Sequence, residues 1–280
     1  MCITPVILKK SKLKDTFIDD YTNFSVPCGK CIECKKLRVN SWYVRLENEL
    51  KRSTSAHFVT LTYDENNIPF TDNGNDTLLF ADVQRMFKRL RKKEAKKHSN
   101  KLAYYCVGEY GERYNRPHYH LIVFNLSSPD VIVDEWLNID LTAPMGFVHV
   151  GKVEPASIFY ALKYTLKSSY KDKDENTDRT PEKAIMSKGL GENFLTEQQI
   201  NKYRKDPSRS VTMLGNKKVS LPRYYRDKIF NQEHKNLLSI RNFKLRKFIN
   251  QKNELTYGKD YVNKQKRRIQ ITKDKIQKTD

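Results

Sequence analysis

The chain has 280 residues, enough for one large domain or for a catalytic domain with extensions. Its 53 Lys and Arg against 33 Asp and Glu give a formal net charge of +20, which indicates a polyanion such as nucleic acid as the partner. Because no apolar stretch approaches the length of a membrane span and the first residues lack the apolar core of a secretion signal, we expect a cytosolic protein.

Three cysteines, Cys28, Cys31 and Cys34, stand close together before the first predicted helix. The spacing Cys-x-x-Cys lets two thiolates bind one metal ion, whereas five cysteines in all do not pair evenly, so disulfides are the weaker interpretation. Ligands of an iron–sulfur cluster and metal-free thiols are the two other interpretations. Cys106 falls within a strand pattern, where we expect a core side chain.

Hydrophobic periodicity predicts the elements of the first half of the chain. Residues 31–52 repeat apolar side chains at helical spacing, and residues 81–98 combine one apolar face with a cationic remainder. Residues 57–63 are rich in β-branched and aromatic side chains, as a strand should be. Two further strands, at 102–110 and 118–124, are joined by a charged segment containing glycine, which favours an antiparallel hairpin.

The second half alternates in the same way. We expect a short helix at 131–137, a strand at 146–153 and a helix at 155–168 that has proline in its first turn. Residues 171–180 are almost wholly polar and predict a surface loop or linker. A basic helix is predicted at 224–252.

The predicted hairpin carries a candidate metal site. In a strand, residues two apart point to the same side, so His118 and His120 face one way while Tyr119 faces the other. Glu109, on the partner strand, can complete the ligand set across the hairpin, and Glu112 is the alternative. Two imidazoles and a carboxylate suit a divalent cation such as Mg²⁺ or Mn²⁺.

The helix at 155–168 carries a candidate nucleophile. At 100° per residue, Tyr160, Lys163, Tyr164 and Lys167 share one side, and the apolar residues share the other. An amphipathic helix with half-exposed tyrosines also explains this pattern. As a nucleophile, a phenol with an ordinary pKa of about 10 needs activation, which the two neighbouring lysines are placed to assist.

These motifs resemble those of the replication initiators of the HUH endonuclease superfamily, within it those of microviruses of the gokushovirus type. The main motifs are FVTLTYD at 58–64, GEYG at 108–111, RPHYH at 116–120 and YALKYTLK at 160–167. The resemblance continues in VPCGKC at 26–31, SKGLG at 187–191 and LPRYY at 221–225, and so covers roughly residues 1–230.

The resemblance implies an α+β fold in which a central antiparallel sheet, flanked by helices, carries the metal site and an adjoining helix carries the tyrosines. It implies an enzyme that nicks one strand at the viral origin, on single-stranded or supercoiled duplex DNA, through a 5′-phosphotyrosine and a free 3′-hydroxyl. After one round of rolling-circle replication, the second tyrosine would release a circular strand. Relaxases place their tyrosines before the His pair, whereas Tyr160 and Tyr164 follow it.

The resemblance also implies the setting of this reaction. No Walker A loop is found, so a host helicase and a host polymerase are the expected partners, in the cytoplasm of an infected bacterium. We expect no membrane partner and no small-molecule cofactor. Because this family begins with a near-terminal cysteine, Cys2 is the expected fourth ligand of a structural Zn²⁺ site with the three clustered cysteines.

The expected organisation has four parts. These are a Cys-rich segment with the first helix at 1–52, the endonuclease core at 53–170, a linker and accessory segment at 171–225, and a basic helical tail at 226–280. The tail holds 16 Lys and Arg against 6 Asp and Glu, a net charge of +10.

Cations interleaved with aromatic residues suit single-stranded DNA, so basic side chains of the tail and one beside the His pair are candidate DNA contacts. They are Arg116, Arg241, Lys244, Arg246, Lys247, Arg267 and Arg268. Two other functions explain part of the pattern. A zinc-containing nucleic-acid-binding protein without activity would bind and not cut, and a metal-dependent nuclease would use water in place of tyrosine.

Overall fold

The computed structural model describes residues 2, 6–9, 23–95, 101–111, 113–167, 178–258, 260, 261, 263, 264 and 267. The chain divides into two compact units. The larger unit comprises Lys35–Gln199 and Val211–Tyr225, and the smaller unit comprises the described residues within Met1–Cys34, Ile200–Ser210 and Arg226–Asp280. Each unit is described by itself below.

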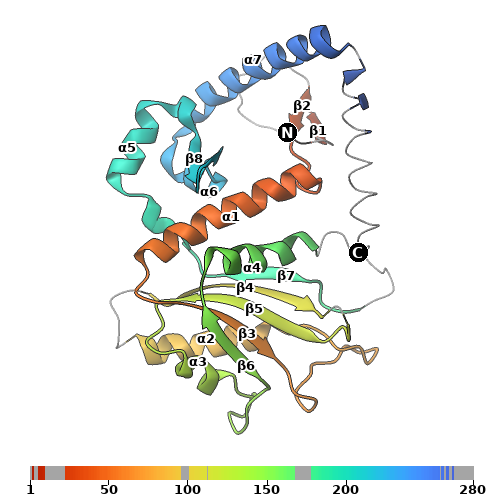
Figure 1. Ribbon diagram of the computed structural model, residues 1–280, viewed down its shortest axis with the longest axis vertical. Coiled ribbons are helices and arrows are strands. Elements are labelled where there is room, and N and C mark those ends of the chain that lie inside the picture. The colour runs from red at the N-terminus through yellow and green to blue at the C-terminus, as the bar shows by residue number, and fades with distance from the viewer. Residues whose placement is uncertain are drawn as a thin grey trace. The chain divides into compact units, whose positions relative to one another are not determined.

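The larger unit is built on a five-stranded sheet in which every neighbouring pair is antiparallel (Figure 1). Its order is β6-β3-β5-β4-β7. The strands are β3 (Ala56–Thr62), β4 (Ala103–Tyr110), β5 (Pro117–Phe124), β6 (Val148–Lys152) and β7 (Lys183–Met186). The expected hairpin at 102–124 is therefore the β4–β5 pair at the centre of the sheet.

Helices α2 (Phe80–Glu94) and α3 (Asp130–Glu135) cover one face of this sheet (Figure 1). The core there combines alternate strand residues, such as Leu61 and Tyr119, with the apolar stripe of α2, such as Phe87. Because strand side chains alternate between faces, the histidines on either side of Tyr119 must point to the opposite face.

Helices α1 (Ile32–Arg52) and α4 (Pro155–Lys167) pack on that opposite face (Figure 1). Ile158, Ala161 and Leu162 of α4 are completely or almost completely buried there. The apolar side predicted for this helix is thus confirmed, and its other side is left to face outward.

Four further elements surround the larger unit's sheet or continue from it. They are the 3₁₀ helix η2 (Glu192–Phe194), the hairpin of β8 (Val211–Leu214) and β9 (Lys217–Ser220), and α6 (Arg223–Ile229), whose last turn lies in the smaller unit. The smaller unit also holds the antiparallel pair β1 (Val6–Lys9) and β2 (Asn23–Val26), α5 (Glu197–Lys205), η3 (Pro207–Arg209) and α7 (Gln232–Tyr257).

The predicted α+β fold class and every helix and strand predicted up to residue 168 are confirmed, with shifts of a few residues at their ends. The single helix predicted at 224–252 is wrong, because α6 ends at Ile229 and α7 begins anew. The side chain of Asn231 accepts a hydrogen bond from the backbone N–H of His234, and so caps α7. Within the described residues, no helix is long and apolar enough to cross a membrane.

Two motifs outside the sheet, SKGLG at 187–191 and LPRYY at 221–225, contact each other. The hydroxyl of Tyr225 donates to the carbonyl oxygen of Gly191 at 2.7 Å, and Arg45 of α1 donates to that of Leu190 at 2.9 and 2.7 Å. Gly191 has φ = 77°, and a Cβ there would lie 2.7 Å from the carbonyl oxygen of Arg45. These motifs therefore have a structural explanation, and glycine is required by both backbone conformation and close approach.

Candidate active site

The strand register brings the predicted metal ligands together. Glu109 of β4 lies directly opposite His118 of β5. Its Oε1 lies 2.7 Å from Nε2 of His118 and 3.2 Å from Nε2 of His120. One ligand atom from each of the three residues lies within 4.8 Å of the others. Two imidazole nitrogens and a carboxylate oxygen can therefore hold one metal ion from one side.

The other ring nitrogens hold the imidazoles in this orientation. Nδ1 of His118 donates to the carbonyl oxygen of Arg116 at 3.0 Å, since a carbonyl can only accept. Nδ1 of His120 lies 3.1 Å from the hydroxyl of Thr60 on β3. Such partners leave Nε2 of both rings for a metal ion. Thr60 was missed by the sequence analysis, because only its pairing with His120 across β3 and β5 reveals it.

Electrostatics favour an ionised carboxylate at this site. Burial acts to raise the pKa of Glu109, but hydrogen bonds and charge from His118 and His120 outweigh it and lower that pKa below its usual value. For His118, burial acts to lower the pKa, yet the hydrogen bonds to Glu109 and to the Arg116 carbonyl raise it overall. The site thus offers an anionic oxygen at neutral pH.

Tyr119, between the two histidines, anchors the strand from the opposite face. Its hydroxyl lies 3.0 Å from that of Tyr63, which donates to Asp82 at 2.8 Å, and it accepts from the backbone N–H of Leu79 at 2.8 Å. All three side chains of this network are buried. The position of β5, and hence of the two imidazoles, is thereby fixed from behind.

Tyr160 lies beside the metal ligands. Its ring centroid is 5.3 Å from that of His120, and Phe58 lies near both, at 5.9 Å from Tyr160 and 5.7 Å from His120. Tyr160 remains 45% exposed, so a large substrate can reach its phenol. Helix α4 therefore brings the first predicted nucleophile to the ligand set.

The remaining predicted catalytic residues are less fully described. Lys163 is exposed on α4, whereas the side chains of Tyr164 and Lys167 lie outside the described part of the structure, as does Glu112. The guanidinium of Arg116 donates to the carbonyl oxygen of Tyr63 at 2.9 Å and forms an ion pair with Glu65.

The predicted basic residues of the tail belong to the smaller unit. Arg241, Lys244 and Lys247 are exposed on α7, and Arg267 is exposed beyond it. The side chain of Arg246 and the whole of Arg268 lie outside the described residues. The structure thus places four of the six on accessible surface, within a unit separate from the metal ligands.

Four cysteines gather in the smaller unit. Cys2 joins Cys28, Cys31 and Cys34, and all four sulfur atoms lie within 4.8 Å of one another. Sγ of Cys31 is 3.8 Å from that of Cys2, and the backbone N–H of Cys28 points at the Cys2 sulfur at 3.2 Å. Burial, with the neighbouring thiols, raises the pKa of Cys34 to about 12. A metal ion that replaces the protons fits this cluster, and four sulfur ligands suit zinc.

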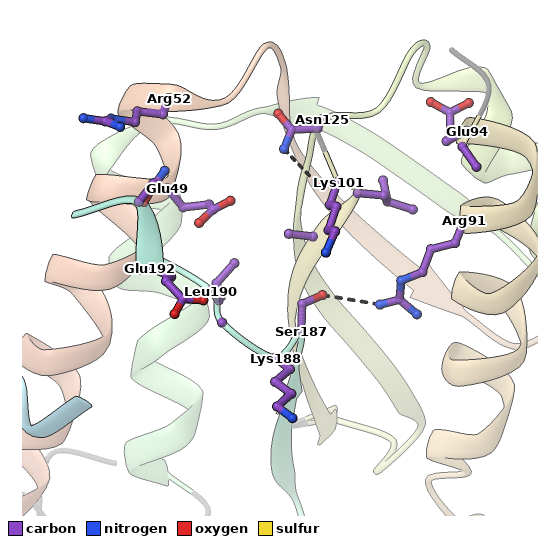
Figure 2. Close-up of a pocket in the computed structure, with 15 residues that line it drawn as sticks. Glu49, Arg52, Arg91, Glu94, Lys101, Asn125, Ser187, Lys188, Leu190 and Glu192 are labelled. Atoms are coloured by element: carbon purple, nitrogen blue, oxygen red, sulfur yellow. Dashed lines mark hydrogen bonds between the residues drawn. The ribbon is translucent and has the colours of Figure 1, made fainter. Parts of the chain in front are cut away.

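A separate cavity of about 980 Å³ lies at the opposite end of the β4–β5 hairpin (Figure 2). Lys101 and Asn125 flank it, next to the start of β4 and the end of β5, whereas Glu109 and His118 lie at the other ends of these strands. Ser187 of the SKGLG motif accepts from Arg91 there at 3.4 Å. None of the predicted site residues lines it, so this cavity is distinct from the metal ligands.

Comparison with known proteins gives one family and several relatives. The family model of the replication-associated protein ORF2 matches residues 56–169. The chain is 29% identical over 214 residues to Replication-associated protein ORF2 of Spiroplasma virus 4, covering 72% of this chain and 67% of that protein. It is 28% identical over 226 residues to Replication-associated protein VP4 of Bdellovibrio phage phiMH2K, with coverage of 74% and 68%.

A third relative is Replication-associated protein ORF4 of Chlamydia phage 1, at 26% identity over 223 residues, 73% of this chain and 53% of that protein. No solved structure matches the chain. The span matched by the family model contains Glu109, both histidines and Tyr160.

Proposed function

Since the chain belongs to the replication-associated protein ORF2 family of Spiroplasma, Bdellovibrio and Chlamydia phages, we propose that it is the endonuclease that initiates rolling-circle replication of such a phage. It would nick one strand at the viral origin by tyrosine attack. The observation that carries this proposal is the Tyr160 ring 5.3 Å from that of His120, beside the three metal ligands.

Glu109, His118 and His120 would hold Mg²⁺ or Mn²⁺, which supplies Lewis acidity and a template for the scissile phosphate. The phenol oxygen of Tyr160 would attack the phosphorus as the bond to the 3′-oxygen breaks. The tyrosine keeps the 5′-phosphate, the phenol proton passes to solvent, and the leaving oxygen takes up a proton to become the 3′-hydroxyl. Lys163 lies three positions further along the same helix and would favour the phenolate form.

Tyr164 lies one helical turn after Tyr160 and would act in the second transfer. In that step a new 3′-hydroxyl attacks the phosphotyrosine, so the energy of the phosphodiester is conserved and a circular strand is released. A host polymerase would extend the first 3′-hydroxyl and a host helicase would separate the strands, in the cytoplasm of the infected bacterium. The tail residues Arg241, Lys244 and Lys247 would add salt-sensitive affinity for DNA.

The test is an incubation with an origin-bearing single strand and Mn²⁺ or Mg²⁺, followed by denaturing electrophoresis. We expect a metal-dependent protein–DNA adduct that is lost in His118→Ala and in Tyr160→Phe/Tyr164→Phe. The single variants report which phenol attacks first, and we expect Tyr160→Phe to lose the first adduct. Cleavage without either phenol would mean hydrolysis by water, and binding without cleavage on any origin tried would favour a non-enzymatic zinc-containing binding protein.

A further inference from the structure

The sheet face that carries the metal ligands is only half covered. Helix α4 packs over β4 and β5, and the outer half of the face belongs to β3 and the edge strand β6. Val148 and Val150 of β6 pack into the core on the other side of the sheet. Strand alternation therefore directs Phe147 and His149 to the face of the metal ligands, and both are exposed.

Phe147 stands in line with the metal ligands across the sheet. The backbone N–H of Thr62 donates to the carbonyl oxygen of Phe147 at 3.0 Å, Thr62 pairs with His118, and His118 pairs with Glu109. Neighbouring strands lie about 4.8 Å apart, so two steps separate the backbones of Phe147 and His118 by about 10 Å. A DNA strand whose phosphate lies at the metal ligands would bring a flanking nucleotide over this ring.

The ring is exposed although its backbone is held tightly. Phe147 is 80% exposed, and no described aromatic ring lies against it. Gly146, with φ = 153°, lets the chain approach β3 so closely that a Cβ would lie 2.4 Å from the carbonyl oxygen of Thr62. The N–H of Asp64 also donates to the carbonyl oxygen of Met145 at 2.9 Å. A large apolar ring is thus presented to solvent from an ordered backbone.

We propose that Phe147 is a stacking platform for a base of the single strand that flanks the scissile phosphate. This rests on the proposed nicking function. Base–aromatic stacking needs an exposed, preorganised ring and is tolerant of sequence, because every base has a π-face. The net charge of +20 favours DNA as the occupant over an apolar protein partner. His149, two residues along the same edge, lies where it can donate to the backbone of that strand.

The test compares wild type, Phe147→Leu and Phe147→Trp, since leucine keeps apolar character without an aromatic face and tryptophan keeps the face. Each full-length protein is titrated without metal, by fluorescence anisotropy, with a labelled mixed-sequence single strand and with an abasic strand of equal length. We expect Phe147→Leu to bind the base-bearing strand about tenfold more weakly and the abasic strand like wild type. Phe147→Trp should retain affinity, and its additional fluorescence should be quenched only by the base-bearing strand.

Equal binding of both strands by wild type and Phe147→Leu would overturn the stacking role, as would an equal loss on both strands. An unquenched tryptophan would overturn it independently, even if the leucine variant failed to fold. The adduct assay, run in parallel, separates the two proposals. If wild type forms no adduct but Phe147→Leu loses base-dependent affinity, the nicking proposal fails alone, and if wild type forms the adduct but Phe147→Leu binds like wild type, the stacking proposal fails alone.

Discussion

His118 and His120 are oriented by partners that the spacing of the two histidines does not reveal. His118 uses the backbone carbonyl of Arg116, so its orientation follows from the local chain. His120 depends on Thr60, a side chain from the neighbouring strand. Because such a partner fixes the ring and its tautomer, it influences metal affinity without contacting the ion.

Thr60→Val should therefore weaken binding of Mn²⁺ by roughly 10- to 100-fold, because valine preserves the shape of threonine and removes the oxygen beside Nδ1 of His120. Isothermal titration with Mn²⁺ measures this directly. Thr62→Val is the matched control, since the hydroxyl of Thr62 donates to the carbonyl oxygen of Phe147 at 3.3 Å and not to a histidine. An equal loss of affinity in both variants would contradict an orienting role specific to Thr60.

The loop after β7 is held between α1 and α6 by buried hydrogen bonds. Besides the bonds to the carbonyl oxygens of Leu190 and Gly191, the carboxylate of Glu49 accepts from the N–H of Gly191 at 2.6 Å. These contacts join segments far apart in the sequence, so they stabilise the arrangement of elements around the sheet rather than any one helix.

Tyr225→Phe should lower the free energy of unfolding by about 1–2 kcal/mol, because it leaves the buried carbonyl of Gly191 without this donor. Urea denaturation followed by circular dichroism measures the change. Tyr257→Phe removes a hydroxyl from a residue that is 57% exposed on α7 and should change the stability by less than about 0.5 kcal/mol. A Tyr225→Phe protein as stable as Tyr257→Phe would show that the hydrogen bond to Gly191 does not stabilise the fold.

At the scale of the whole molecule, the two candidate metal sites belong to different units. The cysteine cluster gathers residues from both ends of the first 34 positions in the smaller unit, and the histidine site lies on the sheet of the larger one. Their ligands also differ in kind. Four sulfurs suit zinc in a structural site, whereas nitrogens with a carboxylate suit an exchangeable divalent cation.

We therefore expect purified protein to contain one zinc ion per chain and Cys31→Ser to lose it, because three remaining thiolates bind zinc far more weakly. Elemental analysis measures the content. Cys106→Ala is the control, since Cys106 is buried in the sheet and should leave the zinc content unchanged. Mn²⁺ affinity at the histidine site should be the same in both variants, and zinc retained by Cys31→Ser would argue against the four-cysteine site.

The amino-acid sequence by itself determined the features that depend on short-range periodicity. Helical spacing predicted α1, α2 and α4, and strand alternation predicted that His118 and His120 share a face. The position of Glu109 followed because a hairpin folds back on itself. The short strands β1, β2, β7, β8 and β9 were missed, since four residues are too few for a period, and the break between α6 and α7 was missed because α-helical propensity continues through it.

Only the tertiary structure decided which distant residues meet. The pairing of β3 with β5 placed Thr60 beside His120, and the packing of α4 on the sheet brought Tyr160 to the metal ligands. The addition of β6 at the edge left Phe147 exposed in line with them. These contacts span tens of residues and arise from the burial of apolar faces, which periodicity can identify but cannot assign to one another.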